Sequence, residues 1–448
     1  MSDLLSIGSS GLTAYRNALT AIGENVANAE TPGYARRRVV MEQAGKGAAA
    51  DIIYRDQVDF QGVATAGVAR AWDQFKATEA RVAASASGRA TVRQQWLTAV
   101  ETSLDDGATG VGASLTRFFN SAAALAGEPG DTLGRTAMLT TLADTTASFR
   151  RTADALGRTS AAVGETAGIE IGSVNQALKA LHELNGTIRT TTPNGSARAS
   201  FEDERDQLID FISEKIDIVA TVNADGTASI NSALDSSVSL LNGVGPGLVS
   251  MVRAADGRLS IQLSTNGSTT PLPLGAGKLA GLVDVAFQTA DRMAQLDALA
   301  ADFVSAINTW SAGGLDANGA AGTNLLEAPT GAASLRLLVT DPDLVPAASA
   351  TAPNGNLIAL EAVREASGVE DKWGTIVSGH AQALSSARSE AAAANSWRDL
   401  SKAALDEVTG IDLDYEAAEL LRYQQAYNAS ARIIQVAREA IDALFAAL

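Results

Sequence analysis

The chain has 448 residues, 46% of them hydrophobic, enough for about two to four domains with hydrophobic cores. Its 34 basic and 51 acidic residues give a formal charge of −17, which argues against nucleic acid or an anionic membrane as the main partner. The absence of cysteine excludes disulfides, thiolate catalysis and cysteine-based metal sites.

The N-terminal sequence MSDLLSIGSSGL does not read as a secretory signal. It carries an acidic residue where such a signal needs basic ones, and Ser and Gly interrupt its apolar run. No later segment approaches the roughly 18 uncharged apolar residues of a membrane span. We expect a soluble protein that, if it leaves the cell, is exported without a cleaved signal peptide.

An apolar seven-residue repeat runs through the first 30 residues. A period of 3.5 residues keeps one stripe of a helix facing a partner helix, so the repeat predicts a coiled coil. The other faces carry few charges, so we expect a helix that is only marginally stable alone. The residues assigned to an assembly interface are Leu5, Leu12, Tyr15, Leu19, Ile22 and Val26.

The segment NVANAETPGY, residues 25–34, predicts the end of this helix. Pro32 biases Thr31 away from the helical region and Gly33 permits a turn, so the helix is expected to end near Ala29. The asparagine amides either satisfy carbonyl groups at the helix end or bond a neighbouring subunit. The residues assigned to the helix terminator and linker are Asn25, Asn28, Pro32, Gly33 and Tyr34.

The basic triplet that follows, residues 36–38, predicts salt bridges at a subunit contact in preference to nucleic-acid binding.

The C-terminal end carries the same seven-residue pattern. The residues assigned there to the assembly interface are Leu420, Tyr427, Ile434 and Ile441. A short repeat alone is more typical of an amphipathic helix packed on an ordinary core. Its presence at both ends favours pairing of the two ends, with each other or with copies of themselves.

The predicted fold is mainly α with an inserted antiparallel β domain. Residues 1–45 and 396–448 form a terminal coiled-coil domain. Residues 46–215 form a helical bundle with short β segments, including DIIY and GVATAGV, and residues 276–395 return to this bundle. Residues 216–275 form a β-rich insertion, expected outermost, in which Asp-Gly and Asn-Gly pairs mark the turns.

The sequence shows no arrangement of residues that indicates catalysis. The two histidines, His182 and His380, are far apart in sequence and lack a metal-like cluster. The carboxylates of FEDERD and GIDLDYEAAE are interpreted as helix-surface charge and compensation of helix dipoles. The stretch DANGAAGTNLLE has Ala321 where a calcium loop requires Gly. We therefore predict no catalytic, cofactor or metal residues.

Several segments resemble one family. SGLTAYRNALTAIGENVANAETPGY, residues 10–34, resembles the N-terminal signature of flagellar rod, hook and hook-associated axial proteins, although Glu24 and Val26 depart from its usual residues. LLRYQQAYNASARIIQ, near the C-terminus, is more similar to hook-associated members than to hook or rod proteins. LTRFFNSAAALAGEP, FEDERDQLIDFISEKI and GAGKLAGLVDV extend the resemblance along most of the chain.

This resemblance implies a structural axial protein of the bacterial flagellum that joins hook to filament and assembles through its terminal helices into a helical tube. The implied partners are copies of itself in a helical or ring assembly, the hook protein, a second junction protein, and a dedicated type III export chaperone at the C-terminal helical region. The implied location is the extracellular flagellum, without nucleic acid or membrane.

Three alternatives remain. A hook or distal rod protein would be a different axial component. A cell-wall glycan hydrolase predicts a cleft with two carboxylates. A secreted adhesin predicts complete folding of both ends in a monomer.

Overall fold

The computed structural model describes residues 2–44 and 62–446, and the predicted extended segment DIIY lies outside them. Contacts divide the chain into two units. Unit 1 comprises Met1–Ser85, Val174–Leu248 and Ser396–Leu448, and unit 2 comprises Ala86–Ser173 and Val249–Asn395. Three long helices run from one unit into the other: α2 (Gln74–Leu104), α4 (Thr132–Thr190) and α8 (Val369–Thr409). The domain boundaries drawn from the sequence stay a prediction.

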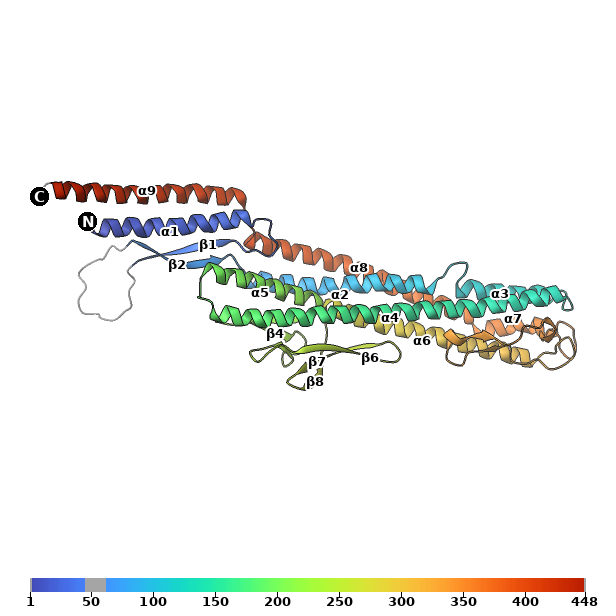
Figure 1. Ribbon diagram of the computed structural model, residues 1–448. Helices are drawn as coiled ribbons and strands as arrows, with labels where there is room; N and C mark the ends of the chain where they lie inside the picture. Colours follow the sequence, from blue (N-terminus) through green and yellow to red (C-terminus); the bar gives the residue numbers. More distant parts are fainter. Residues whose placement is uncertain (1, 45–61, 447–448) are drawn as a thin grey trace. The chain divides into compact units, whose positions relative to one another are not determined.

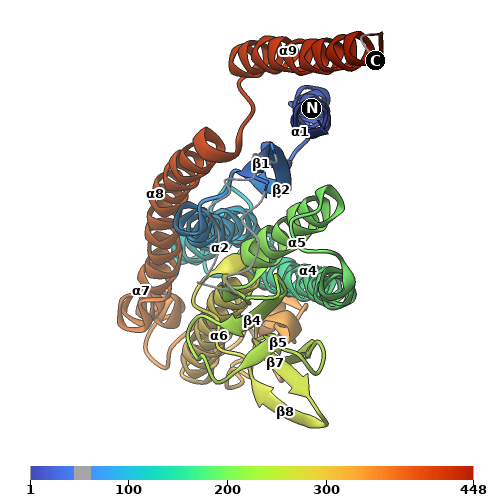
Figure 2. The ribbon, with the colours of Figure 1, turned by 90° about the vertical axis from the view of Figure 1, so that its left-hand side faces the viewer.

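In unit 1, α1 (Ser2–Ala27) and α9 (Leu413–Ala446) lie side by side and antiparallel (Figure 1). A ribbon of two antiparallel strands, β1 (Arg37–Gln43) and β2 (Val63–Arg70), covers α1 on the side away from α9 (Figure 2). The first helix is therefore enclosed by protein on two sides. Pairing of the terminal helices was expected from their repeats, and their supercoiling stays a prediction. Strand β1 was not predicted from the sequence.

The middle of the chain forms two small antiparallel sheets. The sheet of unit 1 has the order β3 (Ile218–Val222), β4 (Ala228–Ser232) and β5 (Ser239–Leu241), and the other has the order β6 (Leu248–Arg253), β7 (Leu259–Thr265) and β8 (Ser268–Pro271). Asn266 and Gly267 both have positive φ, as the tight turn between β7 and β8 requires. The prediction of a mainly α chain with antiparallel β structure in its middle is confirmed.

Unit 2 is built on a hydrophobic core between long helices. The helices that contribute to it with α2, α4 and α8 are α3 (Val111–Leu125), α6 (Gly277–Ala312) and α7 (Gly355–Ser367). At its centre Phe303 stacks on Phe149 with 6.0 Å between ring centroids and meets the edge of Phe118, also at 6.0 Å. All three side chains are fully buried, whereas Phe287, also on α6, is 45% exposed.

The segment between α6 and α7 contains short elements. Strands β9 (Leu326–Glu327) and β10 (Arg336–Leu337) pair antiparallel, and the 3₁₀ turns are η1 (Ala332–Ser334) and η2 (Pro342–Leu344). Across the described ranges, no helix is both long and apolar enough to cross a membrane.

In unit 1, α5 (Ser196–Lys215) follows α4 after a turn at Pro193–Gly195, where the sequence predicts a break. Val68 on β2 donates its backbone N–H to the carbonyl oxygen of Asn194 in this turn, at 2.7 Å. The ribbon that lies against α1 is thus attached to the start of α5.

Candidate functional site

The contact between α1 and α9 depends on two glycines. A Cβ atom at Gly8 would lie 2.6 Å from Cγ1 of Ile434, and one at Gly11 would lie 2.7 Å from Oγ of Ser430. Because glycine has no side chain, the two helix backbones approach closely at these points. The two glycines form a notch in α1 that receives Ser430 and Ile434.

The predicted interface residues of α1 lie at different depths in the single chain. Ile22 is buried, and Tyr15 meets Tyr423 with 6.1 Å between ring centroids. Leu5, Leu12 and Leu19 are half-buried, whereas Val26 is 45% exposed. Apart from Ile22 and Asn25, the buried face of α1 consists of small residues that allow close packing, so the leucine column lies at its edge. These small residues are Gly8, Gly11, Ala14, Ala18 and Ala21.

On α9, the predicted residues Leu420, Tyr427, Ile434 and Ile441 are all half-buried. Beside them α9 has a second column at seven-residue spacing, which sequence reasoning did not single out: Glu416, Ser430 and Ala437 are buried, and Tyr423 between them is half-buried. Contacts of either helix with another copy of the chain stay a prediction.

A polar cluster closes the opposite end of the helix pair. Asn25 and Glu416 are both fully buried, and the Nδ2 of Asn25 donates to Oε2 of Glu416 at 3.1 Å. The other carboxylate oxygen of Glu416 accepts from Nε of Arg36 at 2.5 Å. The guanidinium of Arg36 also lies over the ring of Tyr415, 4.4 Å from its centroid. We call Asn25, Arg36 and Glu416 the polar key.

Asn25 uses its whole amide in this cluster. Its Oδ1 accepts from the backbone N–H of Arg37 at 2.9 Å and from the hydroxyl of Tyr34 at 3.1 Å, and its Nδ2 also donates to the Arg37 carbonyl. Burial raises the pKa of Tyr34 to about 12, so this hydroxyl keeps its proton. In the single chain, the amide of Asn25 therefore joins α1 to β1 and α9, and bonds neither a carbonyl group at the helix end nor, as expected alternatively, a neighbouring subunit.

The remaining linker residues follow Ala27, the last residue of α1. Asn28 donates from Nδ2 to the carbonyl of Glu24 at 2.9 Å, a contact of the capping kind. The carbonyl of Pro32 accepts from the amide of Gln207 on α5 at 3.2 Å. Gly33 has φ +76°, and a Cβ there would meet the Gln207 side chain, so glycine is required at this turn.

A second cluster of buried charges, the charged joint, fastens the ribbon to α5. Asp203 accepts from Arg37 on β1 at 2.9 Å and from Arg70 on β2 at 2.8 Å. Arg70 also donates to Asp206 at 2.9 Å. Burial raises the pKa of Asp203, and the charges of Arg70 and Arg37 act in the opposite direction. The joint thus places both strands on one face of α5.

The same joint continues onto the first turns of α2. Arg81 donates to Asp210 at 2.6 Å and to Asp206 at 3.3 Å, and Arg205 holds Asp206 from its own helix at 3.0 Å. The ring of Trp72 lies beside Arg70, 4.9 Å from its guanidinium carbon. The joint consists of Arg37, Arg70, Arg81, Asp203, Arg205 and Asp206, whose side chains are buried, and of Asp210, whose side chain is 51% exposed.

These contacts correct two interpretations of the sequence. Asp203, Arg205 and Asp206 of FEDERD are buried and not helix-surface charge. Their partners on β1 and β2 lie more than 130 residues away, so no local pattern reports the contact. The basic triplet at residues 36–38 does form salt bridges, but Arg36 and Arg37 find their partners inside the chain.

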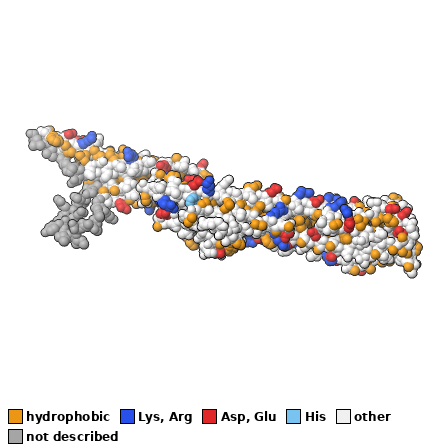
Figure 3. Space-filling model, turned by 60° about the horizontal axis from the view of Figure 1, so that its bottom comes forward, with side chains coloured by type: hydrophobic (Ala, Val, Ile, Leu, Met, Phe, Trp, Pro, Cys, Tyr) orange, Lys and Arg blue, Asp and Glu red, His pale blue; other side chains and the backbone are white. Residues whose placement is uncertain are grey.

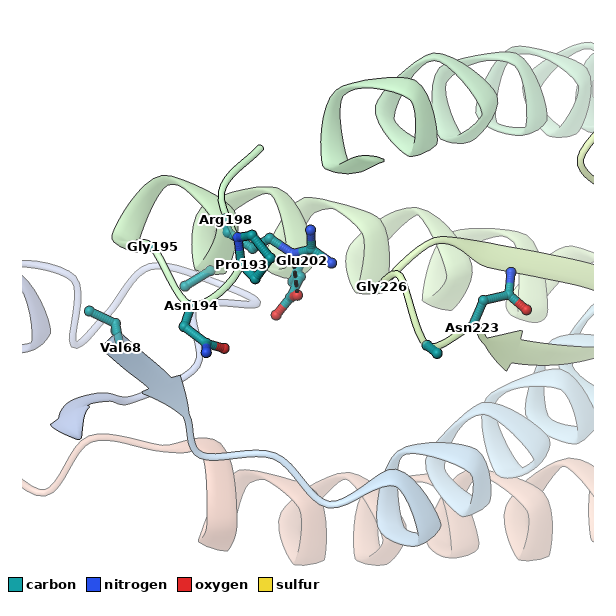
Figure 4. A pocket seen from close by; sticks show the side chains of 10 residues that line it. Val68, Pro193, Asn194, Gly195, Arg198, Glu202, Asn223 and Gly226 are labelled. Atoms are coloured by element: carbon teal, nitrogen blue, oxygen red, sulfur yellow. Dashed lines mark hydrogen bonds and ion pairs between the residues drawn. The ribbon is translucent and has the colours of Figure 1, made fainter. Parts of the chain in front are cut away.

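A cavity of about 230 Å³ lies beside this joint in unit 1, at the Pro193–Gly195 turn (Figure 4). Arg198 and Glu202 project into it side by side, with 3.1 Å between Nε and Oε1. The other nitrogens of Arg198 donate to backbone carbonyls, including that of Ile188 at 2.8 Å. No charge of Arg198 is left unpaired for a ligand.

The described residues contain no group of three or more His, Asp or Glu side chains placed to hold a metal ion. Asp316, in the calcium-like stretch, accepts from the backbone N–H groups of Asn318 and Ala320 and so closes a turn. His380 is buried in unit 2, where its Nε2 lies 2.8 Å from the carbonyl of Leu97. On the face drawn in Figure 3, acidic and basic side chains are interspersed.

Comparison with known proteins agrees with this architecture. The helical domain of flagellar hook-associated protein FlgK matches residues 97–326, and the flagella basal body rod protein family matches residues 5–34. The chain belongs to the flagellar hook-associated protein FlgK family. The second match covers α1 and the predicted terminator, the segment that carries the resemblance in sequence.

Relatives in this family are remote in sequence. Flagellar hook-associated protein 1 of Escherichia coli (strain K12) is 26% identical over 72% of this chain and 59% of its own length. The protein of the same name from Bacillus subtilis (strain 168) is 23% identical over 96% of this chain and 95% of its own length. The chain thus spans under two thirds of the enterobacterial relative. None of these names is that of an enzyme.

A solved structure shows the same fold. The flagellar hook junction protein FlgK from Burkholderia pseudomallei superimposes with a TM-score of 0.50 at 20% identity, over 55% of this chain and 46% of that one.

Proposed function

We propose that this chain is a structural axial protein of the bacterial flagellum that joins the hook to the filament. The observation that carries the proposal is the pairing of the two ends into one helical unit. The names of the FlgK relatives, hook-associated or hook junction proteins, point to the same role. The location that follows is the extracellular flagellum.

The outer surface of the helix pair supports assembly. On the side of α9 away from α1, Leu421 is 59% exposed and Val436 is 61% exposed. Subunits joined through two different patches form open helical arrays, whereas self-complementary patches form closed pairs. An outward apolar column on α9 can therefore pack on the helix pair of the next copy and build a tube wall.

The finer partners follow from the proposed role. They are the hook protein on one side, a second junction protein on the other, and a dedicated type III export chaperone at the C-terminal helical region. Export takes place without a cleaved signal peptide. The two buried carboxylates of the charged joint are paired with arginines, which argues for a structural and against a hydrolytic role at FEDERD.

Deletion of the gene in the source organism tests this function. We expect cells that carry hooks without attached filaments in electron micrographs, and restoration of filaments by the unaltered gene. The double variant Leu421→Glu and Val436→Glu, which places charge on the outer column of α9, is expected not to restore them.

The control is Val244→Glu, a residue 77% exposed in the turn after β5 and away from the helix pair. It is expected to restore filaments fully. Normally attached filaments in the deletion strain would contradict the proposed function.

A further inference from the structure

The repeats of α1 and α9 do not by themselves fix how far one helix is shifted along the other. Residues recur every seven positions, so a shift of one repeat brings another residue of the same column into each place. Such a shift moves α9 by about 10 Å along its axis, at 1.5 Å per residue. We propose that the polar key, Asn25, Arg36 and Glu416, fixes the register of α9 on α1.

The glycine notch excludes a shift in one direction. Gly8 and Gly11 receive Ile434 and Ser430 in the structure. A shift of one repeat toward the start of α9 would bring Tyr427 and Tyr423 to these places. The notch has no room for either ring, because a single Cβ atom already meets side-chain atoms there at 2.6 and 2.7 Å.

The notch does not exclude the opposite shift. That shift would bring Ile441 opposite Gly8 and Ala437 opposite Gly11, side chains no larger than those now present. The apolar contact alone would accept this register. An interaction other than apolar packing must therefore favour the observed register over the shifted one.

The polar key supplies the difference. In the shifted register Tyr423 replaces Glu416 beside Asn25 and Arg36. The amide of Asn25 and the guanidinium of Arg36 would then lose the carboxylate that accepts from them at 3.1 and 2.5 Å. Asn25 is fully buried and Arg36 is half-buried, with 25% of its side chain exposed, so losing this partner is unfavourable, as with polar residues that fix coiled-coil register. Unlike the repeated columns, these three residues form a single set.

The chain connection restrains the same movement. Only residues 410–412 join α8 to α9, and the carbonyl of Thr409 accepts from the backbone N–H of Arg36 at 2.9 Å. Substitution of Glu416 leaves both features in place. It therefore separates the contribution of the polar key from that of the connection.

Cysteine cross-linking in the full-length chain tests the proposal, because the chain has no cysteine of its own. The triple variant Gly11→Cys, Ser430→Cys and Ala437→Cys offers two competing disulfides. A Cβ at Gly11 lies 3.4 Å from the Cβ of Ser430, close to the spacing of a disulfide, so this bond reports the observed register. The bond between residues 11 and 437 reports the shifted one.

With Glu416 in place we expect the bond to residue 430 to dominate in dilute, mildly oxidised monomer, read by peptide mass. Adding Glu416→Ala is expected to raise the ratio of shifted to observed bond at least about tenfold, as for loss of one charge-assisted hydrogen bond. Glu416→Gln, which keeps the shape and removes the charge, is expected to raise it less.

Glu419→Ala is the matched control, since Glu419 lies one turn further along α9 and pairs with Arg422 of the same helix at 2.6 Å. It is expected to leave the ratio unchanged. An unchanged ratio in both Glu416 variants, or a dominant bond to residue 437 with Glu416 present, would overturn the proposal. If the Glu416→Ala variant forms neither disulfide, the ratio of the shifted to the observed bond in the Glu416→Gln variant decides whether the proposal holds. The proposal concerns one chain and is independent of its flagellar role.

Discussion

The core of unit 2 and the charged joint of unit 1 hold helices together by different means. In unit 2, Phe118, Phe149 and Phe303 pack ring against ring within a core of apolar side chains. In unit 1, Asp203 and Asp206 are comparably buried but are held by arginines from three other segments. Apolar burial supplies stability without direction, whereas buried ion pairs stabilise one arrangement of the segments that carry them.

The largest expected effect is in the charged joint. Asp206→Ala leaves Arg70 and Arg81 without a carboxylate they now share, and breaking a buried pair typically costs about 3–5 kcal/mol. We expect urea denaturation followed by circular dichroism to show this loss. Glu204→Ala, an exposed carboxylate on the same helix, is expected to change stability by less than about 0.5 kcal/mol. Equal losses of stability in the two variants would contradict the claim that the charged joint stabilises unit 1.

A core substitution sharpens the contrast with unit 2. Phe303→Leu keeps an apolar side chain and removes the ring contacts with Phe118 and Phe149, at an expected cost of about 1–3 kcal/mol. The same denaturation measures it. Because no partner charge is left unpaired, the effect is expected to be smaller than that of Asp206→Ala. The reverse order would show that the charges stabilise less than their burial indicates.

The glycine notch predicts opposite effects for one substitution at two places in α1. Gly8→Ala forces Ile434 to move and is expected to destabilise the helix pair by about 1 kcal/mol or more. Gly23→Ala meets no atom within 4 Å and is expected to gain up to about 1 kcal/mol from helix propensity. Limited proteolysis of the two ends measures both. Stabilisation by both variants would show that the notch does not constrain α1.

The smallest effect concerns pH in unit 2. Burial lowers the pKa of His380, with Arg292 nearby acting in the same direction and Glu101 opposing it. A lowered pKa means that the unfolded state binds the proton more readily, so stability falls as pH drops through about 6.5. His380→Gln is expected to weaken this dependence between pH 7 and 5. A rise in the stability of the unaltered chain as the pH falls from 7 to 5 would contradict the prediction.

Local signals in the sequence predicted many element boundaries. Pro32 and Gly33 marked the end of α1, the Pro193–Gly195 turn marked the break before α5, and Asn266-Gly267 marked a hairpin. Each of these signals acts within a few residues of the backbone it controls.

The candidate site was predicted only in part. The repeats pointed to pairing of the ends, but the leucines Leu5, Leu12 and Leu19 were expected where small residues make the close contact. The carboxylate of Glu416 was interpreted as dipole compensation, although it is fully buried against α1 and the linker. A charged residue in the first turn of a helix looks the same in sequence whether it faces water or a partner 391 residues away.

The central claim is that the two ends fold together in the free chain through the polar key and the glycine notch. Backbone hydrogen exchange of a verified full-length monomer tests it most directly. We predict that α1 and the first half of α9 exchange slowly, and that Glu416→Ala speeds both while α3 is unchanged. Exchange of both ends at the rate of unstructured peptide in the unaltered chain would contradict the claim, and pairing would then require assembly.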